Sequence, residues 1–195
     1  MEKRQSIIER NTKETQIKLS FCVDGTGTAD VNTGIGFFDH MLELFTVHGL
    51  FDLTVNVQGD LHVDAHHTVE DVGICLGKSI RQSLGDFKGI HRYASGSFPM
   101  DDSLCDIAID ISGRPFLSIE TLPNQQLGAF QSELVEEFFR AVIHNADINL
   151  FVKWPSKGNM HHIIEALFKG FGVLLDQATQ IDQRRTGVPS TKGVL

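Results

Sequence analysis

The chain has 195 residues, of which 41% are hydrophobic, enough to bury the core of one domain or of two small fused halves. The formal net charge of −8 at pH 7 argues against nucleic acid as a main partner, because phosphate binding calls for a basic face. The N-terminal MEKRQSIIERNTKET lacks an apolar signal region, and no stretch approaches the roughly 18 apolar residues of a membrane span, so we expect a cytoplasmic protein without a membrane partner.

Alternating apolar and polar residues predict strands, whereas apolar residues at three- and four-residue intervals predict helices. The predicted order is strand, helix, strand, helix, and it occurs twice. In chain order we expect a strand at 15–23, a helix at 36–48, a strand at 50–57, a helix at 66–84, a strand at 106–111, a helix at 131–145, a strand at 149–153 and a helix at 160–181.

Two of these helices contain the same pattern, His-His-x-x-Glu, at residues 66–70 and 161–165. On a helix, the first His and the Glu lie four positions apart and share a face, so both can bind one metal ion. The second His is rotated by about 100° and points elsewhere. Each pentad therefore offers ligands to two different ions, and two pentads predict two metals.

The sequence also reads as a duplicated α+β unit, with one half at 1–90 and the other at 91–195. Glu14 aligns with Asp102, His40 with Glu137, and the first pentad with the second. Because His40 and Glu137 each precede a pentad, packing of the halves about a pseudo-twofold axis would let each metal draw ligands from both copies. A helix-surface residue is the alternative interpretation of His40.

Eight motifs in the same order give the chain a close resemblance to the imidazoleglycerol-phosphate dehydratases of histidine biosynthesis. They are RNTKET (10–15), GIGFFDHM (34–41), DAHHTVED (64–71), RYASGSFPMDD (92–102), ISGRP (111–115), ELVEEFF (133–139), NMHHIIEALFKGF (159–171) and PSTKGVL (189–195). The resemblance implies duplicated α/β half-domains, with helices packed between two four-stranded sheets. It also implies homo-oligomers in which trimers form a 24-mer, with active sites between subunits.

Two Mn²⁺ ions per site are implied as well. Transferred by motif, one ion binds His66, Glu70, Glu137 and His162, and the other binds His40, His67, His161 and Glu165. Many family members resemble V-E-H-F-F where this chain has Glu136-Glu137-Phe138-Phe139, so a carboxylate stands at Glu137 in place of a His. The first ion site should then be the harder and more anionic of the two.

The implied reaction is that of a hydro-lyase: D-erythro-imidazole-glycerol phosphate loses water to give imidazole-acetol phosphate. No carbonyl lies beside the abstracted proton, so the imidazole ring must accept the charge. Binding of one metal to each ring nitrogen would favour an imidazolate and a diazafulvene-like intermediate. By resemblance, Glu14 is the candidate general base.

The resemblance also supplies residues for the substrate phosphate. The motif-matched cations and hydroxyl donors are Arg92, Arg114, Lys169, Ser190, Thr191 and Lys192. The tail that carries the last three looks flexible by composition, and by resemblance it should become ordered over the phosphate.

Three other functions fit parts of the pattern. A two-metal phosphoesterase would also use His and carboxylate ligands, although such sites favour Asp. A non-catalytic metal-storage assembly would use the ligands between subunits but leaves Glu14 and the cations unexplained. A chain with only the fold of similar units in ribosomal and kinase-related proteins fits poorly with the acidic charge.

Overall fold

The computed structural model describes residues 3–195 and follows the same path twice. The first pass comprises β1 (Gln5–Asn11), β2 (Thr15–Cys22), β3 (Thr28–Asn32), α1 (Gly36–His48), β4 (Asp52–Gly59) and α2 (His66–Ser83). The second comprises β5 (Tyr93–Met100), β6 (Ser103–Asp110), β7 (Phe116–Ile119), α3 (Leu134–Ala146), β10 (Asn149–Ser156) and α4 (Met160–Thr179). A small hairpin of β8 (Gln126–Leu127) and β9 (Phe130–Gln131) is inserted before α3.

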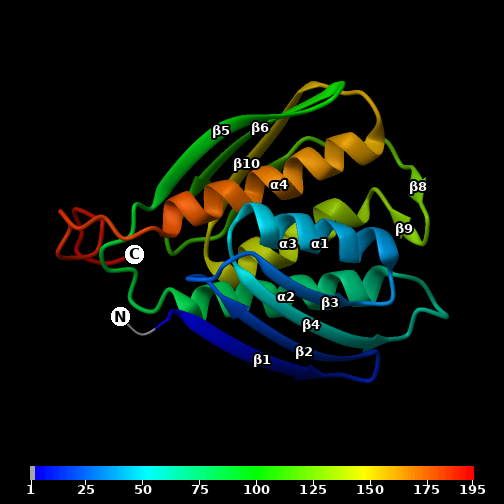
Figure 1. The fold of residues 1–195 in the computed structure, drawn as a ribbon, viewed down its shortest axis with the longest axis horizontal. Coiled ribbons are helices and arrows are strands. Elements are labelled where there is room, and N and C mark those ends of the chain that lie inside the picture. The colour runs from blue at the N-terminus through cyan, green and yellow to red at the C-terminus, as the bar shows by residue number, and fades with distance from the viewer. Residues whose placement is uncertain (1–2) are drawn as a thin grey trace.

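The strands form two four-stranded sheets with the same order, β1-β2-β4-β3 and β5-β6-β10-β7. Figure 1 shows the four helices between these sheets, with α2 against the first sheet and α4 against the second. This arrangement confirms the predicted fold class. Each sheet buries one face, so inward positions are apolar, as in β2, where Ile17, Leu19 and Phe21 are buried and Gln16 and Lys18 between them are exposed.

The helices pair across the two halves, α1 with α4 and α2 with α3. Each pair makes its closest approach at a glycine. A side chain at Gly77 on α2 would collide with the carbonyl oxygen of Val142, and one at Gly172 on α4 would collide with that of Phe45. The two glycines are 95 residues apart, the same spacing as the pentads, so the two crossings occupy equivalent places.

Aromatic side chains fill the space where the helix pairs meet. The rings of Phe45 and Phe171 are stacked with centroids 5.5 Å apart, and those of Phe138 and Phe168 with centroids 5.3 Å apart. All four residues are at most 1% exposed. Such contacts join helices of different halves into one core.

The structure extends the predicted element order and corrects several bounds. Each half has two further strands ahead of its first helix, β1 and β3 in one and β5 and β7 in the other. The helix predicted from residue 131 begins at Leu134, because Phe130–Gln131 pairs in β9. The strand predicted from Leu50 begins at Asp52, since Leu50 adopts a positive φ of 54° in the turn after α1. The last helix ends at Thr179 instead of 181.

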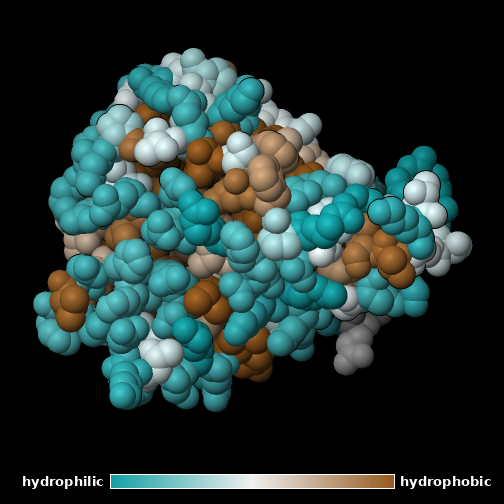
Figure 2. All heavy atoms as spheres, turned by 180° about the vertical axis from the view of Figure 1, so that it is seen from behind, coloured by the Kyte–Doolittle hydropathy of each residue, from teal (hydrophilic) through white to brown (hydrophobic). Residues whose placement is uncertain are grey.

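The face seen from behind in Figure 2 is mainly hydrophilic, and the largest group of hydrophobic side chains on it lies in the upper half, on the side of the second sheet. Tyr93, Phe116 and Phe151 on that sheet are each about half exposed or more, and the last two are in ring contact. Within residues 3–195, no helix combines the length and hydrophobicity needed to cross a bilayer.

Candidate active site

Three potential metal ligands converge where α1 crosses α4. The donor atoms of His40, His161 and Glu165 all lie within 4.8 Å of one another. Nε2 of His161 is 3.2 Å from Oε2 of Glu165, and the His40 and His161 ring centroids are 5.8 Å apart. Two imidazoles and a carboxylate form a donor set that suits a divalent transition metal.

The first turn of α4 holds its part of this cluster firmly. The side chain of Asn159 caps the helix by accepting the His161 backbone N–H at 2.8 Å. The Glu165 side chain is only 9% exposed, and its carboxylate contacts the Lys169 ammonium at 2.6 Å. Burial tends to raise the pKa of Glu165, but the Lys169 hydrogen bond and nearby positive charges outweigh it and lower that pKa. The carboxylate is therefore ionised and ready to bind a cation.

The first pentad brings together fewer candidate metal ligands. His66 and Glu70 face each other on α2 at 3.8 Å, and their side chains are 44% and 45% exposed. Glu137 is half-buried in the first turn of α3, where it lines a small cavity with Glu133 and Glu136. Among residues 3–195, the cluster on α1 and α4 is the only group of three such ligands that converges.

The second histidine of each pentad turns away from its neighbour and binds a carboxylate through Nδ1. His67 pairs with Asp60 at 3.0 Å, and His162 pairs with Asp102 at 2.9 Å. These hydrogen bonds raise the pKa of both imidazoles. Because a ligating His usually donates its other ring N–H to a carboxylate, both side chains are arranged to present Nε2 to a metal. Neither reaches the cluster on its own chain.

Glu14 lies in the tight turn between β1 and β2. Its carboxylate is 53% exposed and approaches Nε2 of His67 at 3.8 Å. Its backbone is fixed on both sides, since its carbonyl oxygen accepts the Asp60 N–H at 3.0 Å and its own N–H donates to the Thr12 hydroxyl at 3.1 Å. The turn therefore presents a free carboxylate beside a candidate metal ligand.

A separate cavity of about 620 Å³ gathers cationic side chains around the C-terminal tail. Of the residues predicted to bind phosphate, five line it, namely Arg92, Arg114, Ser190, Thr191 and Lys192. The tail is tied to the body because the Arg92 guanidinium donates to the Pro189 carbonyl oxygen at 2.8 Å. A cavity lined by three arginines, a lysine and two hydroxyls can hold a phosphate.

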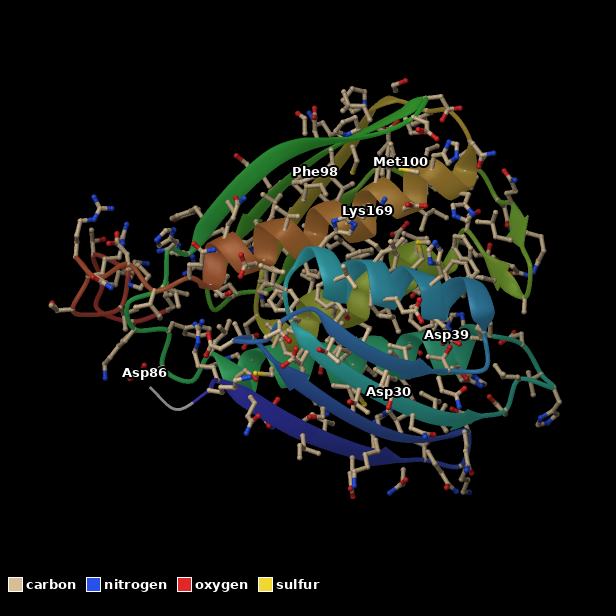
Figure 3. All side chains as sticks on the ribbon, viewed as in Figure 1. Asp30, Asp39, Asp86, Phe98, Met100 and Lys169 are labelled. Carbon is tan, nitrogen blue, oxygen red and sulfur yellow. The ribbon has the colours of Figure 1, made fainter. Side chains whose placement is uncertain are left out.

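Lys169 is the exception, because it lies beside the cluster instead of in this cavity. Its ammonium contacts Glu165 and comes within 3.7 Å of the Met100 sulfur. Figure 3 labels Lys169 on α4 with Met100 nearby on β5.

The cluster and the cationic cavity lie at opposite ends of α4. His161 is in its first turn, whereas the Arg92 N–H donates to the carbonyl oxygen of Ala178 in its last turn at 2.8 Å. At 1.5 Å per residue, the two ends are about 25 Å apart. One small ligand cannot reach both within one chain.

A model of the imidazoleglycerol-phosphate dehydratase family matches residues 33–175, which include both pentads. The chain belongs to this family. The imidazoleglycerol-phosphate dehydratase of Acetivibrio thermocellus is 56% identical over 193 residues, covering 98% of this chain and 99% of that protein. The Geobacter sulfurreducens enzyme of the same name is 53% identical over 193 residues, with the same coverage of both chains. The crystal structure of the Staphylococcus aureus imidazoleglycerol-phosphate dehydratase superposes with a TM-score of 0.82 at 39% identity, covering 91% of this chain and 99% of that one.

Several residues that shape the site were not predicted. Asp60 and Asp102 hold the second histidines, and Asp71, which follows Glu70, holds Thr15 in the turn beside Glu14. Asp71 and Asp102 lie inside motifs that point to the family, so motif membership was the available signal. Asp60 lies outside those motifs, and only its place just after β4 reveals its role.

Proposed function

We propose that this chain is the hydro-lyase of its family and converts D-erythro-imidazole-glycerol phosphate into imidazole-acetol phosphate in histidine biosynthesis. The observation that carries this proposal is the convergence of His40, His161 and Glu165 in a chain of this family. A dehydration whose only electron sink is an imidazole ring needs a bound cation, and this cluster is suited to hold one.

Two Mn²⁺ ions per active site fit the ligands. The converging cluster would hold one ion with His67 as its fourth ligand, and His66, Glu70, Glu137 and His162 would hold the other. In each set three ligands come from one helix pair and the fourth is a histidine turned outward toward an aspartate. When bound, the two ions would withdraw electron density from the ring and stabilise the charge that forms as the proton leaves.

Glu14 would act as general base on the carbon next to the ring. Its exposed carboxylate beside His67 can approach a substrate whose imidazole lies at the metals, whereas Glu70 and Glu165 would be occupied as ligands. Arg92, Arg114 and Lys192, with Ser190 and Thr191, would hold the phosphate at the other end of the substrate, and Lys169 would add a cation from the metal side.

An active site between subunits follows from the separation of these parts. About 25 Å of α4 lies between the cluster and the phosphate cavity, whereas the substrate joins ring and phosphate by a three-carbon chain. The cavity of one copy must therefore serve the metals of another. Assembly of trimers into a 24-mer, in the cytoplasm, is part of this proposal. So is the division of each subunit into duplicated halves at 1–90 and 91–195.

Two assays test the proposal on the purified protein. Metal analysis should find two bound Mn²⁺ per subunit, and incubation with the substrate should yield an absorbing enol or ketone product without release of inorganic phosphate. Release of phosphate would identify a phosphoesterase instead. No product in the presence of full metal would favour a metal-storage assembly.

Mixing variants tests the shared site. His161→Ala and Arg114→Ala subunits should each be inactive alone, because one lacks a metal ligand and the other a phosphate cation. Dissociated and reassembled together, they should recover part of the activity, since some sites then combine an intact cluster with an intact cavity. A mixture as inactive as its components would show that each site is confined to one chain.

A further inference from the structure

The turn that carries Glu14 is anchored to α2 by an ion pair between a half-buried arginine and a buried aspartate, which the proposed chemistry does not use. Asp71 is 5% exposed, and its Oδ1 binds the Arg10 guanidinium at 2.8 Å. Its other oxygen, Oδ2, accepts the hydroxyl of Thr15 at 2.5 Å. Arg10 and Thr15 stand on opposite sides of the β1–β2 turn, so one carboxylate holds both arms of the hairpin.

A second set of contacts closes the turn around Glu14. The Thr12 hydroxyl accepts the backbone N–H groups of Glu14 at 3.1 Å and of Thr15 at 2.9 Å. The Thr12 N–H donates to the Thr15 carbonyl oxygen at 2.8 Å. Because Thr15 links both sets of contacts, the position of Asp71 on α2 determines where the Glu14 backbone lies relative to His67.

The other half of the molecule shows that the fold does not require this ion pair. The strand pairings correspond with a shift of 88 residues, since Arg10 lies opposite Ile17 and Phe98 lies opposite Cys105. Phe98, which Figure 3 labels on β5, therefore occupies the position equivalent to Arg10. The pentad spacing places Ala166 at the position of Asp71. Both equivalent residues of the second half are apolar, as expected if the ion pair is replaceable without loss of fold.

The carboxylates at the tips of the two hairpins also have different tasks. In the second half, Asp102 binds Nδ1 of His162 directly at 2.9 Å. In the first half, Asp60 binds Nδ1 of His67 at 3.0 Å, and Glu14 approaches only the other nitrogen, at 3.8 Å. Because Asp60 orients His67, Glu14 is not needed for that task. The Arg10–Asp71 ion pair occurs only in this half, where the carboxylate at the hairpin tip does not bind Nδ1 of the histidine.

We propose that Arg10, Asp71 and Thr15 form a positioning network that fixes the Glu14 carboxylate for proton abstraction. The inference rests on the proposed role of Glu14 as general base. The three residues are positioning residues, because they act through the turn and touch no substrate. A general base that is held in place loses its conformational entropy when the protein folds. No further entropy is then lost when the base reaches the substrate.

The test replaces the network by apolar side chains, in the triple variant Arg10→Met, Thr15→Val and Asp71→Ala, the last of which copies Ala166 of the second half. Phenylalanine is unsuitable at position 10. In the second half, the Phe98 ring has room because it packs against Gly170, where an added Cβ atom would lie 2.6 Å from the ring. The pentad spacing places Cys75 at the position of Gly170 in the first half, so a phenylalanine at position 10 would collide with its side chain. Phe98→Met is the matched control, because it changes an equivalent strand position without touching the network.

We expect the triple variant to keep its assembly, thermal midpoint and metal content. Its kcat should fall about 100-fold, the loss typical of a reacting group misplaced by about 1 Å, with KM within about twofold. With substrate deuterated at the abstracted position, the isotope effect on kcat should rise, a change that a purely structural role would not cause. The Phe98→Met control should have the kcat of the unaltered enzyme. If the triple variant also had that kcat, the proposal would be overturned.

Two further variants distinguish an error in the proposed network from an error in the proposed role of Glu14. Glu14→Gln with undiminished kcat would refute the base and the network together, whereas loss of activity only in Glu14→Gln would refute the network alone. If the triple variant does not assemble, Thr15→Val decides, because it removes the bond to Asp71 and leaves the ion pair. A lowered kcat with a raised isotope effect supports the network, and an unchanged kcat rejects it.

Discussion

The two pentads occupy equivalent places on α2 and α4, yet their surroundings differ. On α4, the Glu165 side chain is 9% exposed, lies beside Lys169 and converges with His161 and His40. On α2, Glu70 is 45% exposed, and the pentad spacing places Ile74 where α4 has the lysine. The same five-residue pattern thus gives a nearly closed metal cluster in one half and an open pair in the other.

This difference shows that the pentad supplies only part of a site. In the proposed sites, the third ligand would come from the helix packed alongside, which is α1 with His40 in one pair and α3 with Glu137 in the other. A carboxylate at Glu137 is a harder ligand than an imidazole. We therefore expect the two ions to be bound with unequal affinity.

The largest difference in Mn²⁺ affinity between the two sites should come from removing one proposed ligand from each pentad. His161→Ala breaks the preformed cluster, and we expect Mn²⁺ binding there to weaken by more than the roughly 100-fold that loss of an outer contact can cause. His66→Ala should release the other ion with a smaller change, because His66 and Glu70 are exposed and, within the described part of the chain, do not converge with a third ligand beforehand. Calorimetric titration of metal-free protein measures both. Equal losses would remove the distinction between the halves.

The aspartates behind the second histidines provide a finer comparison. Asp60→Ala and Asp102→Ala leave all ligands in place but free the imidazole rings, and each should cost about 10- to 100-fold in metal affinity. Asp60→Ala should also disturb Glu14, because its carboxylate approaches Nε2 of the freed His67 ring at 3.8 Å, so it should lower kcat further. Metal binding and kcat, measured with saturating Mn²⁺, separate the two effects. An equal kcat in both variants would contradict the special arrangement of the first hairpin.

Lys169 should produce a smaller effect of opposite sign. Its ammonium neutralises Glu165 in the metal-free protein and must compete with any ion that binds there. Lys169→Met should tighten Mn²⁺ binding at this cluster several-fold, because the buried carboxylate then lacks a partner until metal arrives. Ile74→Met is the control on α2 and should leave metal affinity unchanged. Weaker binding in Lys169→Met would show that the lysine supports the site instead.

The smallest expected effect is a shift in titration. In metal-free protein, the Asp102 hydrogen bond raises the pKa of His162 above its ordinary value, and that histidine lowers the pKa of Asp102. The pair therefore stabilises the fold below the unfolded histidine pKa of about 6.5, and this contribution is lost as pH rises through the raised pKa. NMR titration should show the His162 pKa falling in Asp102→Asn. No change would mean that the hydrogen bond is absent in solution.

Much of the fold could be predicted from periodicity, and the omissions have a physical cause. The helix over 36–48 was predicted with its observed bounds, because its buried face repeats at helical spacing. The strands β1 and β5 were missed, since each lies at a sheet edge with alternating exposed and half-buried residues. Such strands carry few fully apolar positions, and β5 also contains Gly96 and Pro99.

The candidate site could be predicted in part. The pentads predict metal ligands because their spacing fits one face of a helix, and His161 and Glu165 do converge with His40. The partners of the second histidines could not be found this way, since His162 and Asp102 are 60 residues apart and meet only through the packing of a hairpin against α4. Lys169 and Glu165, by contrast, lie four positions apart on one helix, so spacing alone predicts their contact, and this ion pair competes with the predicted phosphate role.

The cross-half pairing of the helices has a consequence for the origin of the molecule. Each pair draws one helix from 1–90 and one from 91–195, and both crossings are close backbone contacts at equivalent glycines. If the halves descend from one unit, a half-length ancestor could have buried its helices and built its metal clusters only as a symmetric dimer. Gene fusion would then have allowed the two copies to diverge. Asp102 would have kept the task of orienting a histidine, while Glu14 would have become available as a base.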